Sequence, residues 1–270
     1  DEALDTLVSK IKEIRDTHGM ESIGVGQGTG RSHYHHCVRF TNALGTPNWS
    51  EPGLAQCFIP RIMMSMMHFG DLHMPDYYGD VAPECLMFWG CNPFNSGPDG
   101  RVQFGAREYV KKGPKIIVID PRETELARKA DLWLRVRPGT DDALALGMLH
   151  VIIHEELYDK AFVDKWCLGF DQLAQRVEEC TPDWAEKITW VPADQIRSAT
   201  LLYAESKPAA MDWGLALEQH PNCIQTVRAV SLFPALTGNL DIPGGNIMGM
   251  HAVDLVPYLT ENLIPGPMEK

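Results

Sequence analysis

Apolar residues recur at intervals of three and four at the start of the chain. This spacing predicts an amphipathic helix that ends before His18-Gly19. Its apolar face carries Leu4, Leu7, Val8, Ile11 and Ile14. A short strand over residues 23–25 is expected next, followed by the glycine-rich segment GQGTG at 26–30. Successive glycines allow backbone conformations and close approaches that side chains prevent, so Gly28 is a candidate ligand contact.

Residues 31–81 lack this periodicity and are rich in His, Met, Pro and aromatic side chains. Irregular stretches of this length in globular proteins are usually functional or held by a ligand. The segment HYHHC at 33–37 is interpreted as a loop, because neighbouring His and Cys side chains would point to opposite sides of a strand. The segment RIMMSMMHF at 61–69 is predicted to be a methionine-rich helix that packs into the core.

A regular alternation of strands and helices follows. Strands are predicted over 86–89, 115–119 and 132–136, with helices over about 100–112, 122–129 and 141–157. This order predicts an α/β fold with a doubly wound, mostly parallel, Rossmann-like sheet. Further elements are expected as helices over 159–166, 171–178, 193–206 and 221–237 and a strand over 208–214.

Composition excludes several classes of protein. The 270 residues are 44% hydrophobic and 22% charged, and 24 Lys plus Arg against 36 Asp plus Glu give a net charge of −12. Such an acidic chain is poorly suited to tracking nucleic-acid phosphates. The seven cysteines form no CxxC pair, which disfavours a disulfide framework or zinc ribbon. No apolar run approaches the roughly 18 residues of a membrane span, and no leader is visible at Asp1.

Polar residues follow two of the predicted strands, where open α/β sheets bind ligands. After the first, Gly90 lets a ligand approach the backbone, and Asn92 and Ser96 offer polar groups to phosphate or sugar; an ordinary turn is the alternative. After the second, Asp120 is suited to ribose hydroxyls and Arg122 to a base or phosphate. The alternative for Asp120 is capping of the next helix.

A third strand end carries RPGTDDALAL at 137–146. Two carboxylates at the start of a helix repel phosphate but welcome the ring N–H donors of a base. Asp141 is therefore predicted to recognise a guanine-like edge, with simple capping as the alternative. The segment GVGQGTG does not fit the GxGxxG fingerprint, so a nicotinamide enzyme lacks support.

Cys57, in NWSEPGLAQCFIPR, is a candidate thiolate ligand for a soft metal, because the nearby Arg61 and a metal would both lower the thiol pKa. An inert cysteine is the alternative.

Several segments together resemble the central part of the molybdopterin oxidoreductases, the dimethyl sulfoxide reductase superfamily. They are WGCNP, IDPRETELARKADLWLRVRPGTDDALALGMLHVII, EELYDKAFVDKW, WGLALEQH and RAVSLFPALTGNLDIPGGN. The resemblance implies an enzyme that binds molybdenum or tungsten between two molybdopterin guanine dinucleotides and performs two-electron or oxygen-atom transfer on a small substrate.

The resemblance also assigns residues. Cys57 would ligate the metal, and Asp120, Gly139, Thr140 and Asp141 would line the guanosine pocket. Further candidate residues accompany this resemblance, and they lie in motifs that are less specific to the family. The cofactor contacts are Gly28, Trp89, Gly90, Asn92, Ser96, Arg122, Trp213 and Gly214. The catalytic candidates are Cys57, Arg61 and His220, and the substrate-funnel candidates are Arg61, His68 and His220.

The departures from the family pattern bear on the substrate. Phe58 follows Cys57 where formate dehydrogenases have His, and residues 246–253 lack their Arg, so formate is disfavoured. The alternative activity is that of a non-redox tungsten hydratase, lyase or hydroxytransferase, as in acetylene hydratase-like members.

The segment that holds a 4Fe-4S cluster in the family and the C-terminal barrel domain are not among these residues, which indicates a central fragment that is inactive and without cofactor by itself. We expect two interleaved units, an outer one from 1–56 plus 207–270 and a dinucleotide-binding-like one from 57–206. An iron–sulfur electron-transfer subunit is the expected protein partner.

Overall fold

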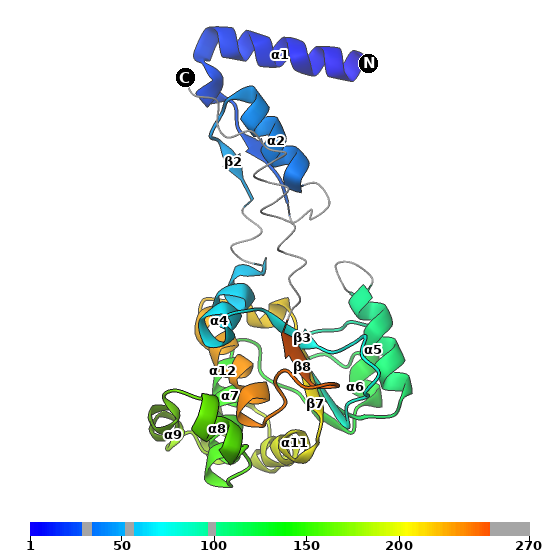
Figure 1. The fold of residues 1–270 in the computed structure, drawn as a ribbon, viewed down its shortest axis with the longest axis vertical. Coiled ribbons are helices and arrows are strands. Elements are labelled where there is room, and N and C mark those ends of the chain that lie inside the picture. The colour runs from blue at the N-terminus through cyan, green and yellow to red at the C-terminus, as the bar shows by residue number, and fades with distance from the viewer. Residues whose placement is uncertain (29–33, 52–56, 97–100, 249–270) are drawn as a thin grey trace. The chain divides into compact units, whose positions relative to one another are not determined.

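A computed structural model of the chain describes residues 1–28, 34–51, 57–96 and 101–248. These residues fall into two compact units, one ending at Cys57 and the other beginning at Phe58. Each unit has its own secondary structure (Figure 1).

The first unit begins with helix α1 (Glu2–His18), which confirms the predicted amphipathic helix although its apolar side chains are solvent-exposed. Strand β1 (Val25–Gly26) pairs in parallel with β2 (Trp49–Ser50). Between them lies α2 (Tyr34–Leu44), so the interpretation of the HYHHC segment as a loop is wrong for residues 34–37. Strand alternation was the wrong test for this segment, because a helix groups residues by intervals of three and four.

The second unit is built on a four-stranded parallel sheet in the order β6-β5-β4-β7. Its strands are β4 (Cys85–Trp89), β5 (Lys115–Ile119), β6 (Leu132–Leu134) and β7 (Ala209–Trp213). Their registers place the last residues of β4, β5 and β7 side by side, since Trp89 pairs with both Ile119 and Trp213. The predicted parallel, doubly wound α/β class is therefore confirmed.

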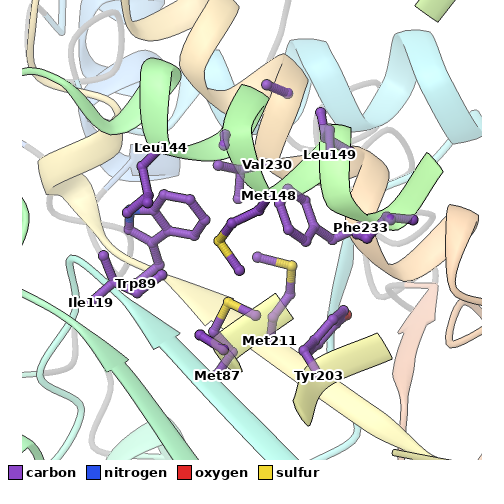
Figure 2. Close-up of a cluster of buried hydrophobic side chains, with 14 of the residues drawn as sticks. Met87, Trp89, Ile119, Leu144, Met148, Leu149, Tyr203, Met211, Val230 and Phe233 are labelled. Carbon is purple, nitrogen blue, oxygen red and sulfur yellow. The ribbon is translucent and has the colours of Figure 1, made fainter. Parts of the chain in front are cut away.

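Alternation along β4 gives the sheet two buried faces. Leu86 and Phe88 pack with side chains of α5 (Arg101–Lys111) and α6 (Glu125–Lys129). Met87 and Trp89 point to the larger core, where α7 (Asp141–His154), α11 (Ala193–Glu205) and α12 (Cys223–Leu236) cover the sheet. Figure 2 shows Met87, Met148 and Met211 gathered beside Trp89 and Phe233 in that core. Both faces of the sheet are therefore covered by apolar side chains, which leaves the strand ends as the places for a polar ligand.

The remaining elements complete the second unit. They are α4 (Ile59–Phe69), β3 (His73–Pro75), α8 (Lys160–Trp166), α9 (Phe170–Val177), α10 (Pro182–Thr189), the 3-10 turn η2 (Leu215–Leu217) and β8 (Asn246–Met248), which pairs antiparallel with β3. Helix α10 was not predicted, although Thr181 followed by Pro182 is a helix-start signal. Within the described ranges, no helix is long and apolar enough to cross a membrane.

Helix α4 confirms the predicted methionine-rich helix but corrects its packing. Met64 is buried, whereas Met63, Met66 and Met67 are 47%, 50% and 72% exposed. Residues on opposite sides of one helix cannot all face the core, and α4 turns one side toward α12.

The division between the units also differs from the expected boundary at residue 206. Strand β7 pairs with β4, and α12 packs on α7, so residues 207–248 belong to the unit that begins at Phe58. The carboxyl ends of all four sheet strands therefore lie within one unit.

The packing of the larger core predicts the effect of truncating Phe233. Phe233→Ala should lower the free energy of unfolding by about 3–5 kcal/mol, because it opens a cavity among fully buried side chains. Phe104→Ala, at a residue that is 64% exposed, should change it by less than about 0.5 kcal/mol. Urea unfolding followed by circular dichroism measures both variants. Equal losses of unfolding free energy would contradict the placement of Phe233 in the core.

Candidate functional site

The chain reverses its direction of travel across the sheet between β4 and β7. From β4 it moves outward to β5 and β6, and it then returns to β7 on the other side of β4. The carboxyl ends of β4 and β7 lie side by side at this reversal, where Trp89 pairs with Trp213. This is where ligands bind in sheets of this kind.

Gly90 and Gly214, the first residues after β4 and β7, allow the two loops to approach each other. Gly214 N–H donates to the Trp89 carbonyl at 3.0 Å, and a Cβ on Gly214 would lie 2.3 Å from the Gly90 oxygen. Gly90 has a φ of +59°, and its Cβ would lie 2.8 Å from Leu217. Both glycines are thus required by the chain itself, and their predicted contact with a cofactor stays a prediction.

Asp141 is held at the end of β4 by a buried hydrogen bond. The Trp89 indole Nε1 donates to Asp141 Oδ1 at 2.8 Å, and Asp141 is 6% exposed. Burial raises the pKa of Asp141, while the indole donor works against that rise by stabilising the carboxylate. The N-cap of α7 is Thr140, so Asp141 is not a simple helix cap.

His220 lies near the same carboxyl. Its positive form would lower the Asp141 pKa, and its Nε2 is buried without a hydrogen-bond partner among the described residues. Asn222, two residues further on, donates to Asp142 through its side-chain amide. The start of α7 and the loop after η2 therefore meet at one polar cluster: Trp89, Asp141, Asp142, His220 and Asn222.

Asp120 occupies the end of β5. It is 4% exposed, and its Oδ1 accepts from the Arg122 backbone N–H at 2.8 Å and lies 3.6 Å from Arg122 Nε. Thr124, not Asp120, caps α6 by accepting from Ala127 N–H. The capping alternative for Asp120 is therefore wrong, and the Asp120 carboxylate shapes the turn that presents Arg122.

An open pocket of about 540 Å³ lies between the ends of β4 and β5. It is lined by Asn92, Asn95, Arg122, Glu123, Thr124, Glu125 and Arg128. Asn92 Oδ1 is buried with no partner in the described part of the chain, so its capacity as an acceptor is unused there. The predicted residues Asn92 and Arg122 are brought together here, and Asn95 and Arg128 are additions that sequence reasoning missed.

The other predicted residues at these strand ends make local contacts. Ser96 Oγ donates to the Asn92 carbonyl at 3.1 Å, and Thr140 Oγ1 donates to the Arg137 carbonyl at 2.7 Å. Gly139 has a φ of +81°, a turn conformation that favours glycine. Their roles in guanosine binding stay predictions.

A second, charged cluster surrounds Arg61 at the end of β7. Arg61 Nε donates to Glu218 Oε1 at 3.0 Å, a terminal nitrogen donates to the Trp213 carbonyl, and the guanidinium lies 4.6 Å from the Trp213 ring centre. Its side chain is 17% exposed. Arg61 thereby joins α4 to the end of β7. Its predicted catalytic role stays a prediction.

Two histidines on the α4 side have lowered pKa values, which favours their neutral forms. Burial, followed by the charge of Arg61, lowers the pKa of His73 to about 3. Burial also lowers the pKa of His68, whose Nδ1 lies 2.8 Å from Ser231 Oγ. His68 is thus packed against α12, and its predicted place in a substrate funnel stays a prediction.

Cys57 and Gly28 belong to the first unit, whereas the strand-end residues belong to the second. The predicted roles of Cys57 as a metal ligand and of Gly28 as a cofactor contact therefore stay predictions. Sequence reasoning missed Asp212 and Glu218. Asp212 was visible as an acid inside the apolar strand AAMDW, a position where a charge needs a partner.

Comparison with known proteins agrees with this architecture. The Molybdopterin oxidoreductase family profile matches residues 1–262, and the chain belongs to that family. It is 37% identical over 260 residues to acetylene hydratase of Syntrophotalea acetylenica, covering 95% of this chain and 35% of that protein. It is 34% identical to formate dehydrogenase H of Escherichia coli, covering 92% of this chain and 35% of that protein.

A solved structure shows the same likeness. Acetylene hydratase from Pelobacter acetylenicus matches with a TM-score of 0.74 and 36% identity, over 92% of this chain and 34% of that chain. The present chain thus spans about a third of the length of the relatives it matches.

The hydrogen bond between Trp89 and Asp141 can be tested with a matched pair of variants. Trp89 and Trp213 are neighbours in register and both buried, but Trp213 Nε1 has no partner in the described residues. Trp89→Phe should lower the free energy of unfolding by about 1–3 kcal/mol more than Trp213→Phe at pH 7, because it leaves a buried carboxylate without its donor.

Urea unfolding of both variants measures this difference. The extra loss should shrink as the pH falls, since protonation of Asp141 removes the charge that the indole stabilises. Equal losses in the two variants at pH 7 would contradict the geometry.

Proposed function

We propose that the protein uses the strand ends of its second unit to bind one arm of a molybdopterin guanine dinucleotide, with Cys57 as the protein ligand of molybdenum or tungsten. The observation that supports this proposal is the set of polar groups at the carboxyl ends of the strands, beside the point where the strand order reverses. Asn92 Oδ1 and His220 Nε2 are buried and unpartnered within the described residues, and Asp120 and Asp141 lie at neighbouring strand ends.

These residues fit an elongated, polar nucleotide. Asn92 and Arg122 line the open pocket and offer an amide and a cation to phosphate. Asp120 and Asp141 would accept from sugar hydroxyls and ring N–H groups. His220, whose Nε2 has no partner among the described residues, and the Trp213 and Gly214 backbone would border the pterin. The apolar core next to these strand ends holds the groups in fixed positions and excludes water from that side.

When bound, such a group supplies two-electron or oxygen-atom transfer at its metal, while the chain supplies position and electrostatics. We propose a small-molecule substrate, and an iron–sulfur electron-transfer subunit as the redox partner. A 4Fe-4S cluster in a preceding segment is part of the same proposal. Family membership supports the cofactor class.

A second candidate is hydration or a related non-redox reaction at a tungsten centre. The likeness to acetylene hydratase in both sequence and structure favours it. The two candidates share the cofactor and differ in whether electrons leave the site.

Metal content tests the role of Cys57. In the full-length protein, Cys57→Ala should lower the bound molybdenum or tungsten and the turnover, each by about 10–100-fold or more, because a lost thiolate leaves the metal without its protein ligand. Elemental mass spectrometry gives metal per polypeptide. Cys167→Ala is the matched control, since Cys167 is also a free, half-buried cysteine.

If Cys57→Ala keeps both metal and turnover, the thiolate is not a ligand, and a nucleotide-binding module without metal chemistry becomes the better description. Loss of metal in both cysteine variants would indicate a folding defect, which circular dichroism reports separately.

Electron accounting separates the two candidate reactions. An oxidoreductase should reduce one equivalent of a two-electron artificial acceptor for each substrate molecule oxidised. A hydratase should form product from an alkyne and water with the acceptor unchanged. Product formation by chromatography and acceptor absorbance, recorded in one reaction, decide between them.

A further inference from the structure

Trp190 presents a large aromatic ring to solvent directly after α10. It is 68% exposed, although tryptophan is highly buried in most folded proteins. Its φ is +65° and its ψ is 8°, the left-handed conformation, which glycine adopts freely and a bulky side chain rarely adopts. The chain therefore keeps an indole at a strained position without using it for the core. Strain of this kind is concentrated at ligand-binding sites.

Neighbouring hydrogen bonds fix the backbone that carries the ring. Trp190 N–H donates to the Glu186 carbonyl at 2.9 Å, and Val191 N–H donates to Thr189 Oγ1 at 3.2 Å. The Glu186 carboxylate accepts from Ala193 N–H at 2.8 Å. Thr189 and Val191, on either side of Trp190, are buried. The turn is thus rigid before any ligand binds, and its one large exposed side chain is the indole.

The ring lies at the carboxyl end of β6. Arg137 follows β6 by three residues, and its N–H donates to the Thr189 carbonyl at 2.8 Å. The guanidinium carbon of Arg137 lies over the Trp190 ring, 4.8 Å from its centre. The Arg137 carbonyl accepts from Thr140 Oγ1 at 2.7 Å, in the turn that leads to Asp141. Trp190 therefore stands beside the segment in which the resemblance to the family places the guanosine pocket.

The chemistry of this position favours a flat, aromatic ligand. Nucleotides bind at the carboxyl ends of parallel strands, and their bases stack on exposed aromatic side chains. The Arg137 guanidinium covers one face of the indole, which holds the ring by a cation–π contact and leaves the rest of it open. A rigid, half-covered indole at a strand end is suited to one stacked base.

We propose that Trp190 is the stacking platform for the guanine base, which lies on the face of the indole opposite Arg137. This rests on the proposed function, because it assigns the base of the bound nucleotide arm to the β6 side of the strand ends. Trp190 is then a positioning residue. It orients the plane of the base and leaves recognition of the base edge to polar groups.

Binding of guanosine monophosphate (GMP) to the full-length protein prepared without cofactor tests this proposal. Trp190→Ala should weaken the affinity, measured by isothermal titration calorimetry, by about 10–100-fold, because the base loses its stacking surface. Trp190→Phe should weaken it less, since a smaller aromatic ring remains.

Trp166→Ala is the matched control and should keep the wild-type affinity. Trp166 is 67% exposed and lies 4.8 Å below the Lys165 ammonium, so its exposure and its cation contact resemble those of Trp190. It belongs to α8, whose N-cap residue Asp159 donates to the carbonyl of Leu236 at the last turn of α12, far from the strand ends.

A second nucleotide separates stacking from edge recognition. Inosine monophosphate (IMP) lacks only the 2-amino group of GMP. The ratio of the GMP and IMP affinities should be the same in wild type and in Trp190→Ala, because a stacking ring does not read that group. A ratio that changes in Trp190→Ala overturns the stacking role.

Urea unfolding tests the strained backbone. Trp190→Gly should unfold at a higher urea concentration than Trp190→Ala, since both variants lose the indole and only glycine adopts a φ of +65° without strain. Both should bind GMP weakly. A stability of Trp190→Ala equal to or above that of Trp190→Gly overturns the left-handed placement of the ring.

Wild-type GMP affinity in Trp190→Ala, equal losses in Trp190→Ala and Trp166→Ala, or no GMP binding by wild type each overturns the platform. Failure of the proposed function is distinguishable from these results. It would appear as full-length protein that contains no molybdenum or tungsten but binds GMP in a manner that depends on Trp190.

Discussion

The pairing of β4 with β5 on one side and β7 on the other is the constraint on which the site depends. Because the three strands are parallel and in register, Trp89, Ile119 and Trp213 end at the same edge of the sheet. The glycines at 90 and 214 let the loops that follow β4 and β7 approach each other closely. The return of β7 brings the residues that follow it to the same edge as those that follow β4 and β5.

Two kinds of polar group meet at that edge. On the β5 side, Asn92 and Arg122 border an open, polar pocket that Glu123 and Glu125 also line. On the β7 side, Arg61 is nearly enclosed and shared by two acids. The pocket and the charged cluster both lie in the second unit.

Family membership sets the cofactor class, and the charged residues narrow what the chain itself contributes. The relatives include a hydratase and a dehydrogenase, so the shared fold supports more than one reaction. A buried guanidinium with two carboxyls is compatible with either, because both reactions exchange protons. The electron count, not the fold, separates them.

Much of the architecture was predictable because it follows from local periodicity. Strand β5 at Lys115–Ile119 has the predicted bounds, since a continuous apolar run followed by Asp120 fits only a buried strand and its end. The helix at 34–44 was missed because histidines at adjacent positions say little about the period of their segment.

By itself, the sequence determined the α/β class, the strand ends that carry polar residues and the resemblance to the family, since each depends on residues close together in the chain. Only the tertiary structure decided that Trp89 donates to Asp141, and that Arg61 meets Asp212 and Glu218 from more than a hundred residues away. Such contacts depend on the order of the strands in the sheet. The hydrophobic pattern does not determine that order, because every buried strand has the same apolar signature.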